Sequence, residues 1–490
     1  MITFIISLVA LLLGYFVYGK FVEHVFGPDD RPTPAITHAD GLDYVVMPYW
    51  KIFMIQFLNI AGTGPIFGAI MGAKFGPVAY LWIVIACIFA GSMHDYFSGM
   101  LSLRHDGLDL PSLVKKYLGS GVAHILTVFI VFMMLAVGAV FVYSPSEILS
   151  DIGGSMTMWM AVIFVYYIIA TMLPIDKIIG KIYPIFAFSL LFMAVSLIVV
   201  LFIKMPALPE IWDGLGNLGK ATHPKEFTQD IFPALFITIA CGAISGFHAT
   251  QSPLMARCMK SERKGRSVFY GAMIAEGLVA LVWATVAMWF FYEDPTPGYM
   301  QIDGGQDKGF LTSAPMVVNL VCNDWLGTFG GILALLGVVA APITTGDTAL
   351  RTARLIIAQF LKLDQHPILH RLYICIPIFI ATFAMLLWQT TNPDGFGTMW
   401  RYVGWATQTL AVFTLWTISV YLAKEHKPYI ISLIPAVFMT VICTFFLTGD
   451  AGFNLSYEMG WVVSLIVVFV CLFFFGKMLK ARGPKTDLKK

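Results

Sequence analysis

The most regular feature of the sequence is a series of long apolar segments separated by short polar ones. About 20 residues of α-helix cover the ~30 Å hydrocarbon layer of a bilayer, and most of these segments reach that length. We predict thirteen membrane-spanning helices, at about residues 2–24, 48–75, 77–102, 121–144, 157–173, 182–204, 231–259, 265–292, 326–361, 367–388, 398–422, 428–448 and 457–478. The ninth is overlong and is interrupted at residues 342–346, so it forms either one tilted helix or two pieces.

Composition agrees with a polytopic helical membrane protein whose first partner is the lipid bilayer. Of the 490 residues, 58% are hydrophobic and 12% are charged, whereas a soluble domain carries about 25% charged residues. No basic run with interleaved aromatic residues indicates a nucleic-acid partner. The seven cysteines form no CxxC pair and predict no disulfide framework.

The second apolar segment carries an unusual run, with Ala61, Gly62, Thr63, Gly64 and Pro65 in its middle. Two glycines two apart weaken a helix, and a proline removes a backbone donor. Unpaired backbone groups are too costly to expose to lipid, so a break at this depth predicts a protein-lined cavity. The freed carbonyls could bind a cation or a substrate group. The alternative is a kink or a glycine-lined helix crossing.

The seventh segment has a matching interruption at residues 241–246, with Gly242, Ser245 and Gly246, and His248 follows. Polar residues inside a span are costly unless they face a cavity. His248 could accept a coupled proton, because the reference pKa of imidazole is near 6.5; the alternative is a histidine bonded to a neighbouring carbonyl. Two broken spans in corresponding positions are typical of a transporter site. We therefore predict a substrate site formed by Gly62, Thr63, Gly64, Gly242, Ser245, Gly246 and His248.

The positions of the two breaks also predict the architecture. When the first span is set aside, the remaining twelve divide into five, five and two, and each group of five begins with a broken span. An odd number of spans per repeat inverts the second repeat, which is the 5+5 arrangement of LeuT-type transporters. The predicted fold is thus all-α, with one extra N-terminal and two extra C-terminal spans. The expected units are residues 1–47, 48–204, 205–422 and 423–490.

The distribution of Lys and Arg predicts the orientation. With the N-terminus outside and the C-terminus in the cytoplasm, 25 of the 31 basic residues fall on the cytoplasmic side. A wrong number of spans would have disturbed this alternation, so the asymmetry supports both the count and the orientation.

Candidates for a coupling ion lie at the predicted interruption of the ninth segment. The hydroxyls of Thr344 and Thr345, together with Ala61, would form an oxygen cluster of the kind that binds sodium in LeuT-type carriers. Asp347 could carry a proton instead. The simplest alternative for Asp347 is an ion pair with Arg351, four residues later.

Three further polar residues lie inside spans. Glu276 is near the centre of its span, and an intramembrane carboxylate is a functional candidate for a coupling ion or proton; the alternative is a carboxyl bonded to a neighbouring helix. We interpret His94 and Asp95 as structural anchors. No HExxH, GxSxG or P-loop motif occurs, which disfavours an enzyme or an ATP-driven pump, and we expect no required cofactor and no resident metal.

Four motifs carry a resemblance to a known family: DGLDYVVMPYW at residues 40–50, IAGTGPIFGAIMGAKFG at 60–76, ITIACGAISGFHATQSP at 237–253 and ITTGDTALRTARLIIA at 343–358. The chain resembles the carbon starvation protein A (CstA) family. The resemblance implies a fold like that of the amino acid–polyamine–cation superfamily and a place in the bacterial inner membrane. It also implies uptake of peptides, or proton-coupled uptake of pyruvate, during nutrient limitation.

These observations favour a secondary importer of peptides that is driven by a proton or a sodium gradient. The alternative is a proton-coupled symporter of pyruvate or another small carboxylate. A rival from another class is a membrane-bound metal- or haem-binding sensor, in which His94, His248 and Glu276 approach one another. The sequence leaves the oligomeric state open.

Overall fold

The computed structural model describes residues 1–39, 44–172, 175–293, 302–303, 306–307, 309–363, 367–392, 395–449 and 452–480. Residues 40–43, which begin the first family motif, and the basic tail 481–490 lie outside the described residues. The described chain is almost entirely helical. Two short antiparallel strands, β1 (Ile302–Asp303) and β2 (Gln306–Asp307), form a small hairpin in one connection.

Helices occupy every predicted span. They are α1 (Ile2–Phe16) with α2 (Tyr18–Phe26), α4 (Tyr49–Ile60) with α5 (Ala69–Ala73), α6 (Val78–Ala86) with α7 (Ser92–Arg104), α9 (Ser120–Ile152), α10 (Met156–Met172), α11 (Ile175–Lys204), α13 (Ile231–Thr238) with α14 (His248–Ala256), α15 (Gly271–Met288), α16 (Ala314–Leu361), α17 (Ile368–Thr391), α18 (Gly395–Lys424), α19 (Ile430–Thr448) and α20 (Tyr457–Lys480). Three short helices, α3 (Pro34–Thr37), α8 (Leu110–Leu118) and α12 (Leu218–Thr222), lie in connections.

By length and apolar composition, nine helices in the described part of the chain can cross a membrane, and a bent pair raises the number to ten. The remaining predicted spans are helical but are not among these: α10 is an apolar helix of 17 residues, α13 and α14 are short, and α16 has 48 residues. The protein is therefore an all-helical, multi-span membrane protein, and the count of thirteen crossings stays a prediction.

Both predicted breaks are confirmed. In the first, α4 ends at Ile60, a π-helical turn (Gly64–Gly68) leads into α5, and the two parts are bent by 53°. In the second, α13 ends at Thr238 and α14 begins only at His248. The intervening chain turns at Gly242, whose φ of 84° is a left-handed conformation that glycine adopts without steric cost.

The predicted interruption of the ninth segment at residues 342–346 is absent, and of the two forms left open the single long helix is the one observed. The backbone of α16 is continuously helical through residues 342–346, although Pro342 lies inside it. The hydroxyl of Tyr167 donates to the carbonyls of Pro342 and Phe141, at 3.1 and 2.9 Å, and thereby holds α16 against α9 at this level. The only non-helical backbone recorded within α16 is at Gly327, with φ 64° and ψ −177°.

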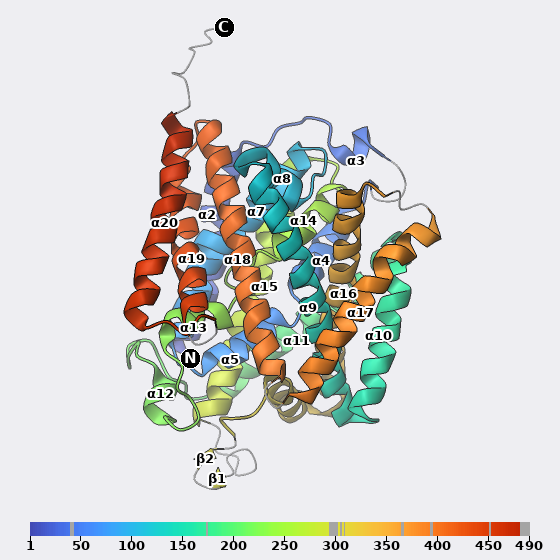
Figure 1. The fold of residues 1–490 in the computed structure, drawn as a ribbon. Coiled ribbons are helices and arrows are strands. Elements are labelled where there is room, and N and C mark those ends of the chain that lie inside the picture. Colours follow the sequence, from blue (N-terminus) through green and yellow to red (C-terminus); the bar gives the residue numbers. More distant parts are fainter. Residues whose placement is uncertain are drawn as a thin grey trace.

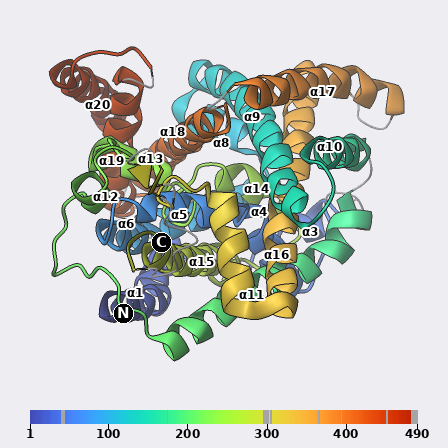
Figure 2. The same ribbon diagram turned by 90° about the horizontal axis from the view of Figure 1, so that it is seen from below.

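The centre of the bundle is built around α15 (Figure 2). In the most apolar part of the span Glu262–Glu293, 83% of the residues are buried, compared with 17% in α20 at the edge. The two broken spans meet beside α15. Gly64, Gly68 and Gly72 lie on one face of the first broken span, and a Cβ at these positions would come within 2.7 Å of residues 238–241 of the second. Small residues at this spacing allow two backbones to approach closely.

Loops that were predicted to be cytoplasmic meet on one face of the molecule, shown at the top of Figure 1 near α3 and α8. The buried carboxylate of Glu262 is bound there by Arg104 at 2.9 Å and by Arg31 at 3.7 Å. Lys427 Nζ donates to the carbonyl of Phe26 at 2.5 Å. These contacts place four connections on a common side, as the predicted alternation requires. The opposite face carries α12 and the strand pair (Figure 1).

Candidate functional site

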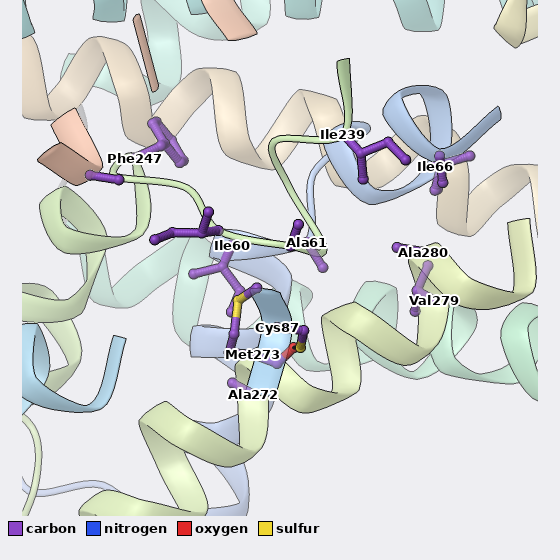
Figure 3. Packing of buried hydrophobic residues seen from close by; sticks show 14 of the residues in the cluster. Ile60, Ala61, Ile66, Cys87, Ile239, Phe247, Ala272, Met273, Val279 and Ala280 are labelled. Atoms are coloured by element: carbon purple, nitrogen blue, oxygen red, sulfur yellow. Dashed lines mark hydrogen bonds between the residues drawn. The ribbon is translucent and has the colours of Figure 1, made fainter. Parts of the chain in front are cut away.

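The two irregular segments lie against each other at the centre of the bundle (Figure 3). A Cβ on Gly64 would lie 2.4 Å from both Cβ and Sγ of Cys241, so the two segments are in contact at this point. The backbone N–H of Gly242, which the break frees from the helix ladder, donates to Glu276 Oε1 of α15 at 3.2 Å. A carboxylate therefore satisfies a backbone donor exactly where the second span is uncoiled.

A cluster of four ionisable side chains surrounds this contact, and all four are fully buried. His248, the first residue of α14, has its Nδ1 2.8 Å from Asp95 Oδ2 and its Nε2 3.4 Å from Glu276 Oε2. The other oxygen of Asp95 bonds to His94 Nδ1, also at 2.8 Å. The imidazole of His248 thus lies between carboxylates from α7 and α15. Two carboxylates at membrane depth are costly unless protons or cations balance their charge.

Several polar atoms around the two breaks make no hydrogen bond within the described part of the chain. They are Asn59 Oδ1, Thr63 Oγ1, Ser245 Oγ, His248 Nε2 and Glu276 Oε2. All belong to residues that are at most 1% exposed. Leaving a buried polar group without a partner costs about 1–3 kcal/mol. Water or a bound ion can supply partners for such atoms.

A small cavity of about 40 Å³ lies next to the breaks. Gly62, Gly64, Cys241, Phe247 and Thr345 are among the residues that line it. A water molecule needs roughly 10–15 Å³ measured in this way, so the space holds an ion or a few waters. It is too small for a peptide, and a substrate would need the surrounding helices to move apart.

The predicted ion ligands of α16 divide into two groups. Thr345 faces the first break, since its Oγ1 lies 3.0 Å from the Cβ position of Gly62, and its hydroxyl donates to the carbonyl of Ala341. Thr344 donates to the same carbonyl at 2.9 Å. Asp347 is buried and lies 3.8 Å from Arg351, the ion pair that was the alternative interpretation.

The other predicted residues have various surroundings. Ala61 and Thr63 are buried at the first break. Gly246 packs directly on α18, where a Cβ would lie 2.1 Å from the backbone nitrogen of Ala411, and its N–H donates to the carbonyl of Thr407 at 2.9 Å. We attribute the glycine at 246 to this close packing.

The sequence predicts His94 and Asp95 as structural anchors and identifies no partner for them. In the structure Asp95 bonds His94 and His248 instead. A signal was present, because a carboxylate in an apolar span is unusual. The identity of its partner depended on the packing of α7 against α14, which no local pattern reports.

The cluster also has a possible metal-binding geometry. One donor atom each from Cys241, His248 and Glu276 lie within 4.8 Å of one another. These are donor types that transition metals accept, and a carboxylate on the far ring nitrogen is common behind a metal-bound histidine. The sensor hypothesis expected His94 in this group, but Cys241 occupies that place.

Comparison with known proteins identifies the family. The profile of the family described as "Carbon starvation protein CstA" matches residues 1–151, 143–294 and 300–446. The chain belongs to the CstA family.

The chain is similar to several relatives, some of which are named as transporters. An uncharacterized membrane protein of Haemophilus influenzae is 45% identical over 343 residues, which cover 60% of this chain and 92% of that protein. Peptide transporter CstA of Escherichia coli is 28% identical, with 56% of this chain and 48% of that protein covered. Pyruvate/proton symporter BtsT of E. coli is 26% identical, with 56% and 47% covered. The match spans about half the length of both E. coli relatives.

The fold of this CstA-family protein also has a solved counterpart. A manganese transporter of Eremococcus coleocola superposes with a TM-score of 0.56 and 13% identity, covering 90% of this chain and 97% of the transporter. The chain is therefore a membrane transporter by family, with the fold of a polytopic transporter.

Proposed function

We propose that this CstA-family protein is a secondary active importer of peptides in the bacterial inner membrane, driven by protons that bind the Asp95–His248–Glu276 cluster. The observation that carries the proposal is the position of this cluster. It is fully buried, and it is bonded to the uncoiled backbone of the second broken span through Gly242. Import of pyruvate or another small carboxylate is the alternative. The names of the relatives, a peptide transporter and a pyruvate/proton symporter, support both substrates.

The architecture that we propose is the LeuT-type inverted repeat, in the units 1–47, 48–204, 205–422 and 423–490. Two broken spans that meet at the centre support it. The excess of Lys and Arg in the loops on the face of Arg104 and Glu262 supports a cytoplasmic position for that face, with the N-terminus outside.

The substrate would bind where the two breaks meet. Gly62 and Gly64 border the central cavity, and α14 begins nearby at His248 with the positive end of its dipole. A substrate carboxylate is favoured at such an end. Thr63 and Ser245 offer buried hydroxyl oxygens that lack partners within the described chain.

Coupling follows from the position of Glu276, which accepts from the N–H of Gly242 and also faces His248. Imidazole takes up a proton near neutral pH in water, and His248 has carboxylates facing both ring nitrogens, from Asp95 and Glu276. Cys241 and His94 are the other titratable groups in contact with this set. A proton on Glu276 neutralises the carboxylate that accepts from Gly242, and a proton on His248 places a positive charge beside that carboxylate. The shape of the second break and the occupancy of the proton site thus depend on each other.

A sodium ion is the alternative driving ion. Ala61, Thr344 and Thr345 would then supply oxygens, and Asp347 a negative charge. The proximity of Thr345 to Gly62 supports this arrangement, although the hydroxyls of both threonines also bond to Ala341.

Counterflow and accumulation in proteoliposomes test the proposal. Labelled dialanine and labelled pyruvate are supplied under imposed proton or sodium gradients. We expect His248→Gln to abolish proton-driven accumulation and to retain counterflow, which needs no net proton movement. His124→Gln, at an exposed histidine of α9, is the matched control. Uptake that ignores both gradients would contradict coupling, and unchanged proton-driven accumulation by His248→Gln would remove the cluster from the mechanism.

The geometry of Cys241, His248 and Glu276 favours one rival, a metal-binding sensor. Elemental analysis of the purified protein separates the two functions. A stoichiometric transition metal that is lost in Cys241→Ala, together with no uptake of either substrate, would favour the sensor.

A further inference from the structure

A second and larger cavity, of about 270 Å³, lies between α8, α14 and the C-terminal part of α16. Thr250, Leu254 and Arg257 line it from α14, and Thr352, Ile356 and Gln359 line it from α16. Its volume approaches the lower limit of ~300 Å³ for small-molecule sites. It is therefore a space in which a short peptide could fit with modest opening.

This cavity continues the path from the central site. Phe247 and Thr345 line the central cavity, and the residues that line the larger one follow at helical spacing on the same faces. On α14 and the residues that flank it the series is 247, 250, 254 and 257, and on α16 it is 345, 352, 356 and 359. Residues three, four and seven apart share a helix face. The series ends at Arg257 and Gln359, on the side where Arg104 binds Glu262.

The guanidinium of Arg257 lines the cavity and has no acidic partner among the described residues. Arg257 Nε donates to the carbonyl of Gly107 at 3.0 Å, and its guanidinium lies 5.3 Å from the ring centre of Tyr44. No carboxylate of the described residues lies within 4.0 Å of it. Its neighbours differ, because Arg31, Arg104, Arg263 and Arg266 each pair with an Asp or Glu at 2.6–2.9 Å. A guanidinium that is held in place and has no carboxylate partner among the described residues is suited to an anionic ligand.

The carboxylate of Asp109 lines the same cavity. Asp109 caps α8, where its Oδ1 accepts from the N–H of Ser112 at 2.9 Å. No basic side chain of the described chain lies within 4.0 Å of Asp109. The walls between the two charges are largely apolar, with Leu110, Pro111 and Leu254. One positive group, one negative group and apolar walls match a molecule with an ammonium, a carboxylate and short side chains.

We propose that this cavity is a cytoplasmic-side binding site for short zwitterionic peptides, in which Arg257 binds the α-carboxylate and Asp109 the α-ammonium. This inference rests on the proposed transport function and decides between its two substrates. A monocarboxylate such as pyruvate would use Arg257 and leave Asp109 without a role. The site is separate from the proton cluster, so it determines which substrate is released and does not supply the driving ion.

The test measures binding of dialanine, N-acetyl-dialanine and pyruvate to the purified full chain by calorimetry. Charged hydrogen bonds of this type predict that Arg257→Gln weakens dialanine about 10- to 100-fold and that Arg257→Lys restores part of the loss. Asp109→Asn keeps the helix cap, because Asn caps as well as Asp. It should weaken dialanine and leave N-acetyl-dialanine unchanged. Arg263→Gln, on the same face but paired with Asp30, is the control and should have no effect.

Labelling locates the bound peptide. Maleimide modification of a Thr352→Cys variant, compared with the unsubstituted chain, should be slowed by dialanine. Equal dialanine affinity in Arg257→Gln and the parent, or binding of pyruvate in preference to dialanine, would overturn the assignment. If dialanine shows no counterflow in the parent, the proposed peptide transport fails. If counterflow occurs and the Arg257 and Asp109 variants bind normally, only this inference fails.

Discussion

Replacing Gly64 by alanine tests the contact on which the whole site depends. The added Cβ would lie 2.4 Å from both Cβ and Sγ of Cys241, more than 1 Å inside the 3.5–4.0 Å separation of carbon atoms in contact. Cβ of Cys241 is fixed to the backbone, so it cannot rotate away. The second break would have to move by about 1 Å.

The magnitude follows from two opposing terms. Overfilling a packed interior costs about 1–3 kcal/mol, while alanine gains up to ~1 kcal/mol over glycine in helical conformation. We expect a net loss of roughly 0–3 kcal/mol, or an apparent melting temperature lower by up to about 3 °C in detergent for a chain of this length. Transport should suffer more, because a shift of Cys241 carries Gly242 away from Glu276.

Two further variants make the result specific. Gly121→Ala in α9 adds the same methyl group where no atom lies within 4 Å, so its stability and transport should match the parent. The double variant Gly64→Ala/Cys241→Gly removes the obstructing atoms and should recover part of the transport. Parent-like melting and transport in Gly64→Ala would refute the described contact between the two breaks.

Three other predictions concern separate parts of the chain. Asp347→Asn should abolish substrate accumulation with expression intact; normal accumulation would exclude a coupling role and leave its ion pair with Arg351 as the explanation. Gly327→Ala should lower the melting temperature by the equivalent of about 1–3 kcal/mol, since φ 64° and ψ −177° are almost restricted to glycine, and a parent-like melt would contradict that backbone. Burial, with a further contribution from Lys116, lowers the pKa of His105. The unfolded chain therefore binds a proton more tightly at this histidine, and the stabilisation present above pH ~6.5 is lost on acidification. Between pH 7.5 and 5.5 the melting temperature should therefore decrease less in His105→Gln than in the parent.

The parts of the fold that could be predicted from the sequence are those set by local chemistry. Gly62, Gly64 and Pro65 break a helix because of their own backbone properties, and the break lies where they predicted it. Pro342 misled the analysis for the same reason. A proline removes a single donor, and the backbone of α16 remains helical through Pro342, whose carbonyl accepts a hydrogen bond from Tyr167.

The candidate site was predicted only in part, because it depends on contacts between distant segments. Gly242, His248 and Glu276 were each singled out by their unusual presence in apolar spans. Their connection through one hydrogen bond and one imidazole required α14 and α15 to lie side by side. Asp95 completes the set from a third helix, 153 residues away from His248 in the sequence.

The unbroken course of α16 past Pro342 has a mechanical consequence. Thr345 lines the central cavity and Gln359 lines the larger cavity, and the two residues lie about 20 Å apart on one uninterrupted part of the helix. Near its middle, α16 contacts Tyr167, whose hydroxyl donates to the carbonyl of Pro342 and whose ring packs against Gly346. If the helix rotates as a rigid body about this contact, its parts on either side move in opposite directions. Because the backbone is non-helical at Gly327, only the part of α16 that follows it can move in this way. Spin labels at the exposed Ile332 and Leu361, each paired with one on α9, should then show distance changes of opposite sign.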